Sequence, residues 1–342
     1  MAILEREQMT KPLYQVVLAT YNGSAYLEQQ IVSILNQLGD GELLVHDDGS
    51  SDGTGDILQK WSHLDHRIRI LDAPSYGNAR ANFSYLLSET TSPYVFLSDQ
   101  DDIWLHNKIE ELLRIIRNGE SQYGSSVPIL VHSDLVLVDG IGETIAPSMW
   151  RYQNLNPEWC QSLNLLLAQN VVVGCTTLVN RALIREALPI PSMATMHDHW
   201  LALVACISGR IFYTKKPTVL YRQHSGNAVG AKEISIVSRM RKMVELLSGK
   251  SYPEKQVREM GQMYATASAL AAIYPAGEVG RKLRHFALLE RCSTVERIKI
   301  IFSERFFMNG VISNITWILM PRKYAYRATI FLAAIFKRRN NA

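Results

Sequence analysis

The stretch Tyr14-Gln15-Val16-Val17-Leu18-Ala19-Thr20-Tyr21-Asn22-Gly23 decides the fold of the chain. Its first six residues are mostly apolar, as in a buried strand, and a polar turn follows them. Apolar side chains then recur at helical spacing between residues 25 and 37, namely Leu27, Ile31, Ile34 and Leu35. A strand, a polar turn and an amphipathic helix are therefore predicted in succession.

The same unit recurs along the first half of the chain. Strands are predicted at residues 42–46, 67–71, 94–97 and 129–132, and helices begin near Ile57, Asn82 and Trp104–Lys108. This alternation predicts an α/β fold with a Rossmann-like, mainly parallel sheet flanked by helices. Ligands of such sheets bind at the carboxyl ends of the strands. Polar clusters follow three of these strands, at residues 20–22, 47–48 and 99–102.

Composition and charge narrow the class of protein. The 342 residues are 47% hydrophobic, enough for a sizeable core, and the net charge is +4. Residues 1–230 hold 16 Lys and Arg against 24 Asp and Glu (net −8), and residues 231–342 hold 20 against 8 (net +12). After about Ala231 the sequence becomes helix-rich and basic. A boundary is predicted there, with a different task on each side.

Several classes are disfavoured. The scattered cysteines (Cys160, Cys175, Cys206 and Cys292) indicate reduced thiols instead of a disulfide or zinc framework. The first eleven residues lack the apolar core of a signal peptide, which predicts a cytoplasmic protein. No apolar run approaches the ~18–20 residues that span a bilayer.

Three carboxylates crowd the turn Asp99-Gln100-Asp101-Asp102, directly after an apolar strand. Such crowding costs free energy unless a cation offsets it, and oxygen ligands suit Mg²⁺ or Mn²⁺, which also bind diphosphates. The alternative is a solvated acidic turn in which Asp102 caps the following helix. The run from Asp47 to Thr54 has a similar ambiguity, because Gly and Asp are ordinary turn residues.

Three motifs, taken in their order along the chain, resemble those of a known family, and this resemblance favours a functional site over an ordinary turn. Residues 19–22 (Ala-Thr-Tyr-Asn), residues 47–54 (Asp-Asp-Gly-Ser-x-Asp-Gly-Thr) and residues 99–104 (Asp-x-Asp-Asp-x-Trp) resemble the family 2 glycosyltransferases with the GT-A fold. Residues 174–176 (Gly-Cys-Thr), 197–200 (His-Asp-His-Trp) and 221–227 (Tyr-Arg-Gln-His-x-x-Asn) resemble its bacterial rhamnosyltransferase-like branch. The similarity covers roughly residues 14–231.

The resemblance implies a domain plan and a donor site. Residues 1–230 would form the GT-A catalytic domain, with a nucleotide-sugar half at about 12–135 and an acceptor half at about 136–230, and residues 231–342 would form a helical, basic region. Tyr21 and Asp48 would contact the base of a dTDP- or UDP-sugar. The donor site would also include Ala19, Thr20, Asn22, Asp99, Asp102 and Arg222, with Arg80 a weaker candidate for the diphosphate. The acceptor would meet Gly174, Cys175 and Trp200.

The resemblance also implies roles in catalysis. Asp101, with His224, would bind the metal, and Asp198 would be the general base of an inverting transfer, because an acceptor hydroxyl is a poor nucleophile until it loses its proton. Residue 197 is His where the family more often has Glu, which puts a role for that position in doubt. Arg222 and the metal would neutralise the leaving nucleoside diphosphate. The acceptor would be a glycan or lipid-linked glycan in cell-surface polysaccharide synthesis, such as O-antigen.

Some motifs also fit other kinds of site or protein. The pairs His132/Asp134 and His197/His199 suggest zinc, but no further ligand stands at a suitable spacing. Trp150, Trp159 and Trp200 fit either a sugar site or the core. A nucleotidyltransferase would share the sheet, but the turn at residues 20–24 lacks the expected basic residue. A binding protein without catalysis would have lost Asp101 or Asp198.

The basic tail leaves two alternatives. Residues 311–320, residues 324–336 and the basic residues 337–339 combine apolar and aromatic side chains with flanking cations. This pattern fits a segment that lies on an anionic membrane, on the inner face of the plasma membrane, or a helical hairpin packed on the rest of the protein. Nucleic acid is not an expected partner.

Overall fold

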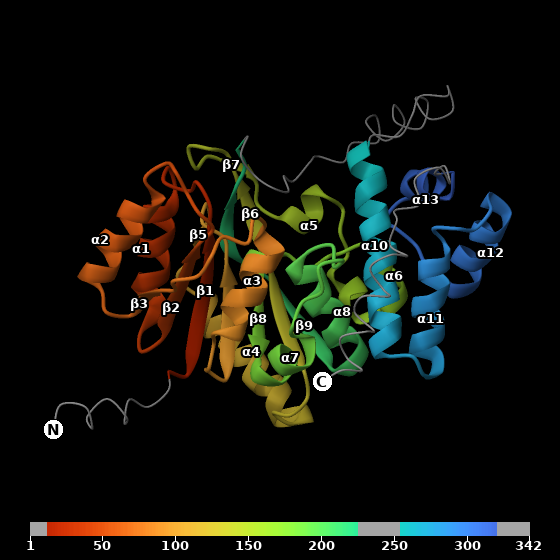
Figure 1. Cartoon of the computed structure of the whole chain (residues 1–342), viewed down its shortest axis with the longest axis horizontal. Coiled ribbons are helices and arrows are strands. Elements are labelled where there is room, and N and C mark those ends of the chain that lie inside the picture. The colour runs from red at the N-terminus through yellow and green to blue at the C-terminus, as the bar shows by residue number, and fades with distance from the viewer. Residues whose placement is uncertain (1–11, 225–253, 320–342) are drawn as a thin grey trace. The chain divides into compact units, whose positions relative to one another are not determined.

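The computed structural model describes residues 12–224 and 254–319, which fall into two compact units (Figure 1). The first unit comprises the chain up to Gln161, Val171–Ile190 and Met196–Glu233, and the second comprises Ser162–Asn170, Pro191–Thr195 and the chain from Ile234. The predicted boundary at residue 231 did not anticipate the two short stretches in the second unit. Long-range contacts explain them: the Thr195 N–H donates to Thr266 Oγ1 at 3.1 Å, and Asn164 Nδ2 donates to the Glu304 carbonyl at 2.6 Å.

Parallel strands build the first half of the first unit. β1 (Tyr14–Thr20) pairs in parallel with β2 (Glu42–Asp47) and β4 (Tyr94–Ser98), and β2 pairs with β3 (Ile68–Ile70). The connecting helices are α1 (Leu27–Leu38), α2 (Thr54–Leu64) and α3 (Ala79–Ser88). In this register the carboxyl ends of β1, β2 and β4 lie at one edge of the sheet, where the three polar clusters follow them.

The second half of the sheet mixes parallel and antiparallel strands. β8 (Leu178–Asn180) lies antiparallel between β4 and β6 (Ile129–Val138), and β9 (Arg210–Arg222) runs parallel to β6. Two short strands, β5 (Ile103–Trp104) and β7 (Thr144–Ala146), pair antiparallel with β9 and β6. Six of the nine strands in the described sheet therefore share one direction, which confirms the mainly parallel α/β prediction.

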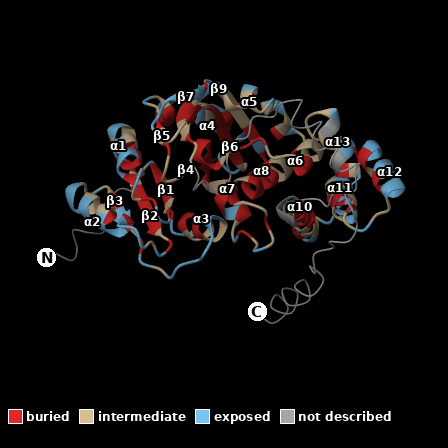
Figure 2. Cartoon of the chain, turned by 90° about the horizontal axis from the view of Figure 1, so that it is seen from above, coloured by how far each residue is buried: buried red, intermediate tan, exposed pale blue. Residues whose placement is uncertain are grey.

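The remaining helices of the first unit cover this sheet. They are α4 (Lys108–Tyr123), α5 (Met149–Tyr152), α7 (Arg181–Ala187) and α8 (His197–Ser208), with 3-10 turns η2 (Pro157–Gln161) and η3 (Gly174–Thr176). Burial follows the apolar periodicity (Figure 2): Val16, Leu18, Phe96 and Val131 on the strands are completely buried. A rigid, apolar sheet thus supports the polar strand ends.

One short element was not predicted. Ile103 and Trp104 form β5, because they pair with Leu220 and Val219 of β9. The following helix, α4, begins at Lys108, within the predicted range of residues 104–108. Contacts distant in sequence therefore decide the conformation of residues 103 and 104.

Helices form the second unit. They are α6 (Leu163–Ala168), α10 (Glu254–Ile273), α11 (Gly277–Leu288), α12 (Thr294–Glu304) and α13 (Val311–Ile318). The Trp317 ring of α13 is buried, and its indole N–H donates to the Tyr264 hydroxyl at 2.8 Å. This favours packing for residues 311–319, whereas residues 324–339 lie outside the described part. Among the described helices, none combines the length and hydropathy that a membrane span requires.

Candidate active site

Buried acids gather after β4. Asp102 is fully buried, and its Oδ2 has no hydrogen-bond partner among the described residues. Ligand atoms of Asp99, Asp102 and Cys175 all lie within 4.8 Å of one another. Burial, together with the nearby charges of Asp101 and Asp198, raises the pKa of Asp99 to about 7. Burial also raises the pKa of Asp102 well above its ordinary value. The cluster therefore favours a cation.

A buried lysine, which the sequence analysis missed, lies beside these acids. Lys108 at the start of α4 is completely buried, donates a hydrogen bond to the Cys175 carbonyl and lies 3.7 Å from the centre of the Trp104 ring. Burial lowers the pKa of Lys108 to about 7, although Asp102 and Asp99 oppose this shift. In the sequence, the signal for Lys108 was its place four residues after Trp104 of the acidic motif. A lysine near the start of a helix is usually exposed, so its burial was not predicted.

The end of β9 brings Arg222 and His224 to the acidic turn. Arg222 is buried: its Nε donates to the Asp101 carbonyl at 3.1 Å, its backbone N–H donates to Asp102 Oδ1 at 3.3 Å, and its guanidinium lies 4.7 Å from the Tyr26 ring centre. His224 Nε2 is 2.9 Å from Asp101 Oδ2. The two residues proposed as metal ligands are thus neighbours, although 123 positions separate them. Asn227 of the same motif lies outside the described residues.

Asp198 occupies the first turn of α8. Its Oδ1 accepts from the His199 N–H at 2.6 Å, and its Oδ2 accepts from the Gly174 N–H at 3.2 Å. Burial raises the pKa of Asp198 to about 6, while these backbone hydrogen bonds oppose the shift. Since Met196 is the N-cap residue of α8, Asp198 is not at the cap position itself. Its carboxylate is fixed by two backbone donors and close enough to influence Asp99.

The turn after β1 is fastened to the acidic turn. The Tyr21 N–H donates to Gln100 Oε1 at 2.7 Å, and Gln100 Nε2 donates to the Tyr21 carbonyl at 2.9 Å. Asn22 has a positive φ of 48°, and its Oδ1 accepts from the Ser51 N–H at 2.9 Å. The Tyr21 side chain stays 58% exposed. Ala19 and Thr20 end β1 just before this turn, and Thr20 is buried.

Asp48 is held by the loop before α3. Its Oδ1 accepts from the backbone N–H groups of Tyr76 and Gly77 and from Ser75 Oγ at 3.0 Å. The described residues provide no hydrogen bond to its Oδ2. Asp48 therefore has one oxygen that shapes the loop and one available for a ligand, as recognition of a base imide would require.

The remaining candidates from the sequence are the predicted acceptor residues and Arg80. The Trp200 side chain is buried and donates to the Ala187 carbonyl at 2.8 Å, which favours the core interpretation over acceptor contact. Cys175 is also buried, beneath the acids. Gly174 is confined, since an added Cβ would lie 2.8 Å from His197 Nε2. Arg80 is half-buried at the start of α3, and burial lowers its pKa.

The histidines do not form the suggested zinc site. His132 and His197 are buried, burial lowers the pKa of each to about 3, and their ring nitrogens have no hydrogen-bond partners in the described chain. The His197 ring stacks on Phe83 with centres 3.9 Å apart. Asp134 instead accepts from Ser148 Oγ and from the Trp150 N–H at 3.3 Å, at the start of α5. The ligand cluster described above contains no histidine.

Comparisons with known proteins identify the class. Residues 15–131 match the model of glycosyl transferase family 2. The dTDP-rhamnosyl transferase RfbG of Shigella flexneri is 26% identical over 279 residues, 77% of this chain and 90% of that protein. The UDP-Glc:alpha-D-GlcNAc-diphosphoundecaprenol beta-1,3-glucosyltransferase WfgD of Escherichia coli is 27% identical over 169 residues, 49% of this chain and 59% of that protein.

Solved structures agree on the fold. Crystal structures of S. aureus TarS residues 1–349, with and without UDP-GlcNAc, align with TM-scores of 0.51 and 0.52 at 16% identity, over 86% of this chain and 73% and 72% of those chains. Together, the family match at residues 15–131, the curated relatives and the structural neighbours support a family 2 glycosyltransferase with the GT-A fold. The chain is a glycosyltransferase, as the resemblance implied, and the nucleotidyltransferase alternative gains no support.

Proposed function

We propose that this protein transfers a sugar from a dTDP- or UDP-activated donor to a glycan or lipid-linked acceptor, with inversion, during synthesis of a cell-surface polysaccharide such as O-antigen. The carrying observation is that Asp198 Oδ2 accepts a hydrogen bond from the N–H of Gly174, the residue before Cys175, and that the Cys175 sulfur lies within 4.8 Å of ligand atoms of Asp99 and Asp102. Such a transfer needs a general base and a cation site. The carboxylate of Asp198 on α8 would serve as the base, and the acidic cluster after β4 would bind the cation. The rhamnosyl and glucosyl transferases named above support the substrate class.

The general base is assigned to Asp198. A carboxyl with a pKa of about 6 is mostly ionised at neutral pH, and it is a stronger base than an ordinary aspartate. Backbone N–H groups of Gly174 and His199 hold it in one orientation. It would accept the proton of the acceptor hydroxyl as that oxygen attacks the anomeric carbon. Attack from the face opposite the leaving group gives inversion.

The residues fit a divalent cation, Mg²⁺ or Mn²⁺. The unpartnered Oδ2 of Asp102, and a pKa of Asp99 that stays raised although Lys108 is nearby, indicate that the acids carry more negative charge than Lys108 offsets. Asp101 and His224 would hold the ion, and Asp99 and Asp102 would flank it. When bound, the cation would supply charge neutralisation for the diphosphate. The Arg222 guanidinium is anchored beside the same turn, where it would add positive charge.

Donor recognition is assigned to the ends of β1 and β2. The exposed ring of Tyr21 offers a stacking surface, and Asp48 Oδ2 would accept the imide N–H that thymine and uracil share. This common edge explains why two donor bases satisfy the same residues. A lipid-linked acceptor at the inner face of the plasma membrane fits the basic character of residues 231–342. WfgD, by its name, acts on a diphosphoundecaprenol-linked sugar.

A donor panel tests the proposal. Purified protein would be incubated with dTDP-rhamnose, UDP-glucose, UDP-GlcNAc, GDP-mannose and CMP-sialic acid, with Mg²⁺, Mn²⁺ or EDTA, while nucleotide release and melting temperature are measured. We expect release and metal-dependent stabilisation with thymidine or uridine donors. Selective release from GDP-mannose or CMP-sialic acid, or full activity in EDTA, would overturn the base or metal assignment.

A further inference from the structure

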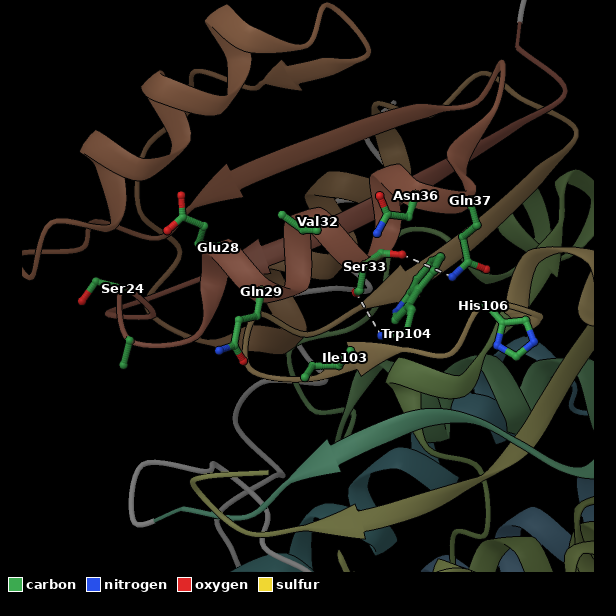
Figure 3. Close-up of a pocket in the computed structure, with 11 residues that line it drawn as sticks. Ser24, Glu28, Gln29, Val32, Ser33, Asn36, Gln37, Ile103, Trp104 and His106 are labelled. Carbon is green, nitrogen blue, oxygen red and sulfur yellow. Dashed lines mark hydrogen bonds between the residues drawn. The ribbon is translucent and has the colours of Figure 1, made fainter. Parts of the chain in front are cut away.

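A second site lies in the first unit, along the exposed face of α1. This groove has a volume of about 590 Å³ between α1, the turn before it, β5 and the loop to α4 (Figure 3). Such a volume falls within the ~300–1,000 Å³ of small-molecule sites. The groove is lined by Ser24, Ala25, Glu28, Gln29, Val32, Ser33, Asn36, Gln37, Ile103, Trp104 and His106. None of these residues has a role in the donor site proposed above.

Most of the lining residues are polar and uncharged, and apolar atoms lie between their polar groups. Neither lysine nor arginine is among its residues, and its one carboxylate, Glu28, is 2.7 Å from the ammonium of Lys60. Phosphates and nucleic acids require positive charge, so the groove does not suit them. Amides, hydroxyls and an imidazole can both donate and accept hydrogen bonds. The lining therefore suits a neutral ligand rich in hydroxyl groups.

The groove is shaped before any ligand arrives. Ser33 Oγ accepts from the Trp104 N–H at 3.0 Å, and Gln37 bridges to the next helix, donating to the Leu105 carbonyl at 2.9 Å and accepting from the Ile109 N–H at 3.1 Å. Figure 3 shows the hydrogen bonds that join Ser33 to Trp104 and to Gln37. Because α1 is tied to β5 and α4, binding does not need to order the walls.

Two polar side chains remain available for a ligand. Asn36 and His106 are exposed and form no hydrogen bonds with described residues. Val32, which is 37% exposed, and Ile103 add apolar surface between them. A sugar ring presents hydroxyl groups at its rim and C–H groups on its face, so it matches both features. The amide of Asn36 can engage two adjacent hydroxyls.

The groove shares its wall with the acidic cluster. Gln29 Oε1 accepts from Arg222 Nη2 at 2.8 Å, and Arg222 also binds the Asp101 carbonyl. Trp104 lines the groove, and its ring face contacts Lys108 Nζ at 3.7 Å. A polymer that reaches the acids is therefore within a few residues of this groove.

We propose that the groove binds uncharged sugar residues of the glycan acceptor, away from the hydroxyl that receives the new sugar. This inference rests on the proposed function, because it presumes a glycan acceptor. In this proposal α1 and β5 form a glycan-binding surface, and Asn36 and His106 contact the glycan.

The test is a matched pair of amide substitutions. Asn36→Leu removes the groove amide, and Gln59→Leu removes an exposed amide on α2, away from the groove. The probe is a fluorescent neutral tetrasaccharide of rhamnose and N-acetylglucosamine, measured by polarisation against wild type, both variants and His106→Ala. Asn36→Leu should weaken binding about tenfold, which corresponds to one or two lost neutral hydrogen bonds, and Gln59→Leu should not. Melting temperatures verify folding.

The outcomes separate the two proposals. Equal affinity in wild type, Asn36→Leu and His106→Ala, equal weakening by Gln59→Leu, or no binding by wild type would overturn the groove assignment. Nucleoside-diphosphate release without acceptor is measured in parallel for wild type. If no donor gives release while probe binding depends on Asn36, the transferase proposal fails and the glycan surface stands.

Discussion

Asp198→Asn tests the central assignment, because it removes proton-accepting ability at almost constant shape. The carboxylate accepts two backbone hydrogen bonds, from His199 at 2.6 Å and from Gly174 at 3.2 Å. Asparagine retains one acceptor oxygen, and its NH₂ group then faces the other N–H donor. The substitution therefore removes the base and one hydrogen bond.

The two losses differ in magnitude. A positioned base contributes ~10²–10⁴-fold, which at ~1.36 kcal/mol per tenfold is about 3–5 kcal/mol of activation free energy. The unsatisfied N–H costs about 1–3 kcal/mol of stability. The raised pKa of Asp198 in the folded state affects stability in the opposite direction, in favour of the variant at high pH. Asp198 supports folding fully below its unfolded pKa of 3.8, and this support is lost as pH rises through about 6. Above pH 7 asparagine avoids that penalty, so we expect only a small change in melting temperature.

Acceptor-dependent nucleoside-diphosphate release measured from pH 4.5 to 9 distinguishes base loss from structural damage. Wild-type kcat/KM should rise with pH and level off above about 6, where Asp198 is ionised. The variant should lose this limb together with its 10²–10⁴-fold activity, while donor affinity is unchanged. Asp56→Asn, at an exposed position of α2, is the matched control. Near-normal turnover of Asp198→Asn, with the same acid limb, would refute the reasoning.

Three further outcomes are expected. Asp101→Asn should abolish the rise in melting temperature produced by Mn²⁺ with a nucleoside diphosphate, and an undiminished rise would remove Asp101 from the metal site. Lys108→Met should lower the free energy of unfolding, measured in urea, by about 3–5 kcal/mol, because it removes the ammonium that lies beside the buried acids. Lys108→Arg should lower it less. Equal stability of wild type and Lys108→Met would show that the acids do not need the ammonium. Deleting residues 320–342, which include six Lys and Arg, should weaken binding to anionic vesicles by ~1 kcal/mol per cation near the surface, and vesicle binding that survives deletion would place the anchor elsewhere.

Local patterns predicted the parts of the fold that local sequence controls. The strand at residues 14–20 and the helix after it follow from apolar periodicity, and the strand ends followed by Asp47 and Asp99 identified the binding edge. β5 escaped prediction because a two-residue strand has no period, and its partners on β9 lie more than 100 positions away. The burial of Lys108 likewise depends on Cys175 and Trp104, which only the folded chain brings together.

The residues of the candidate site also divide into those whose place the sequence predicted and those whose place depends on the fold. Asp101 and His224 were paired by resemblance before the structure placed them 2.9 Å apart, a contact that no local pattern shows. Trp200 illustrates the opposite outcome: its motif suggested acceptor contact, but α7 and α8 enclose the ring. A motif fixes where the backbone of a residue lies, whereas neighbouring elements decide which way its side chain faces.

The amide of Gln100 gives the proposed base contact a thermodynamic advantage. It binds both the N–H and the carbonyl of Tyr21, as a neighbouring strand would, and so immobilises that backbone when the protein folds. Fixing one residue's backbone costs about 1–2 kcal/mol of conformational entropy. Because folding has already absorbed this cost, an arriving nucleotide has only the rotation of the exposed ring left to restrict.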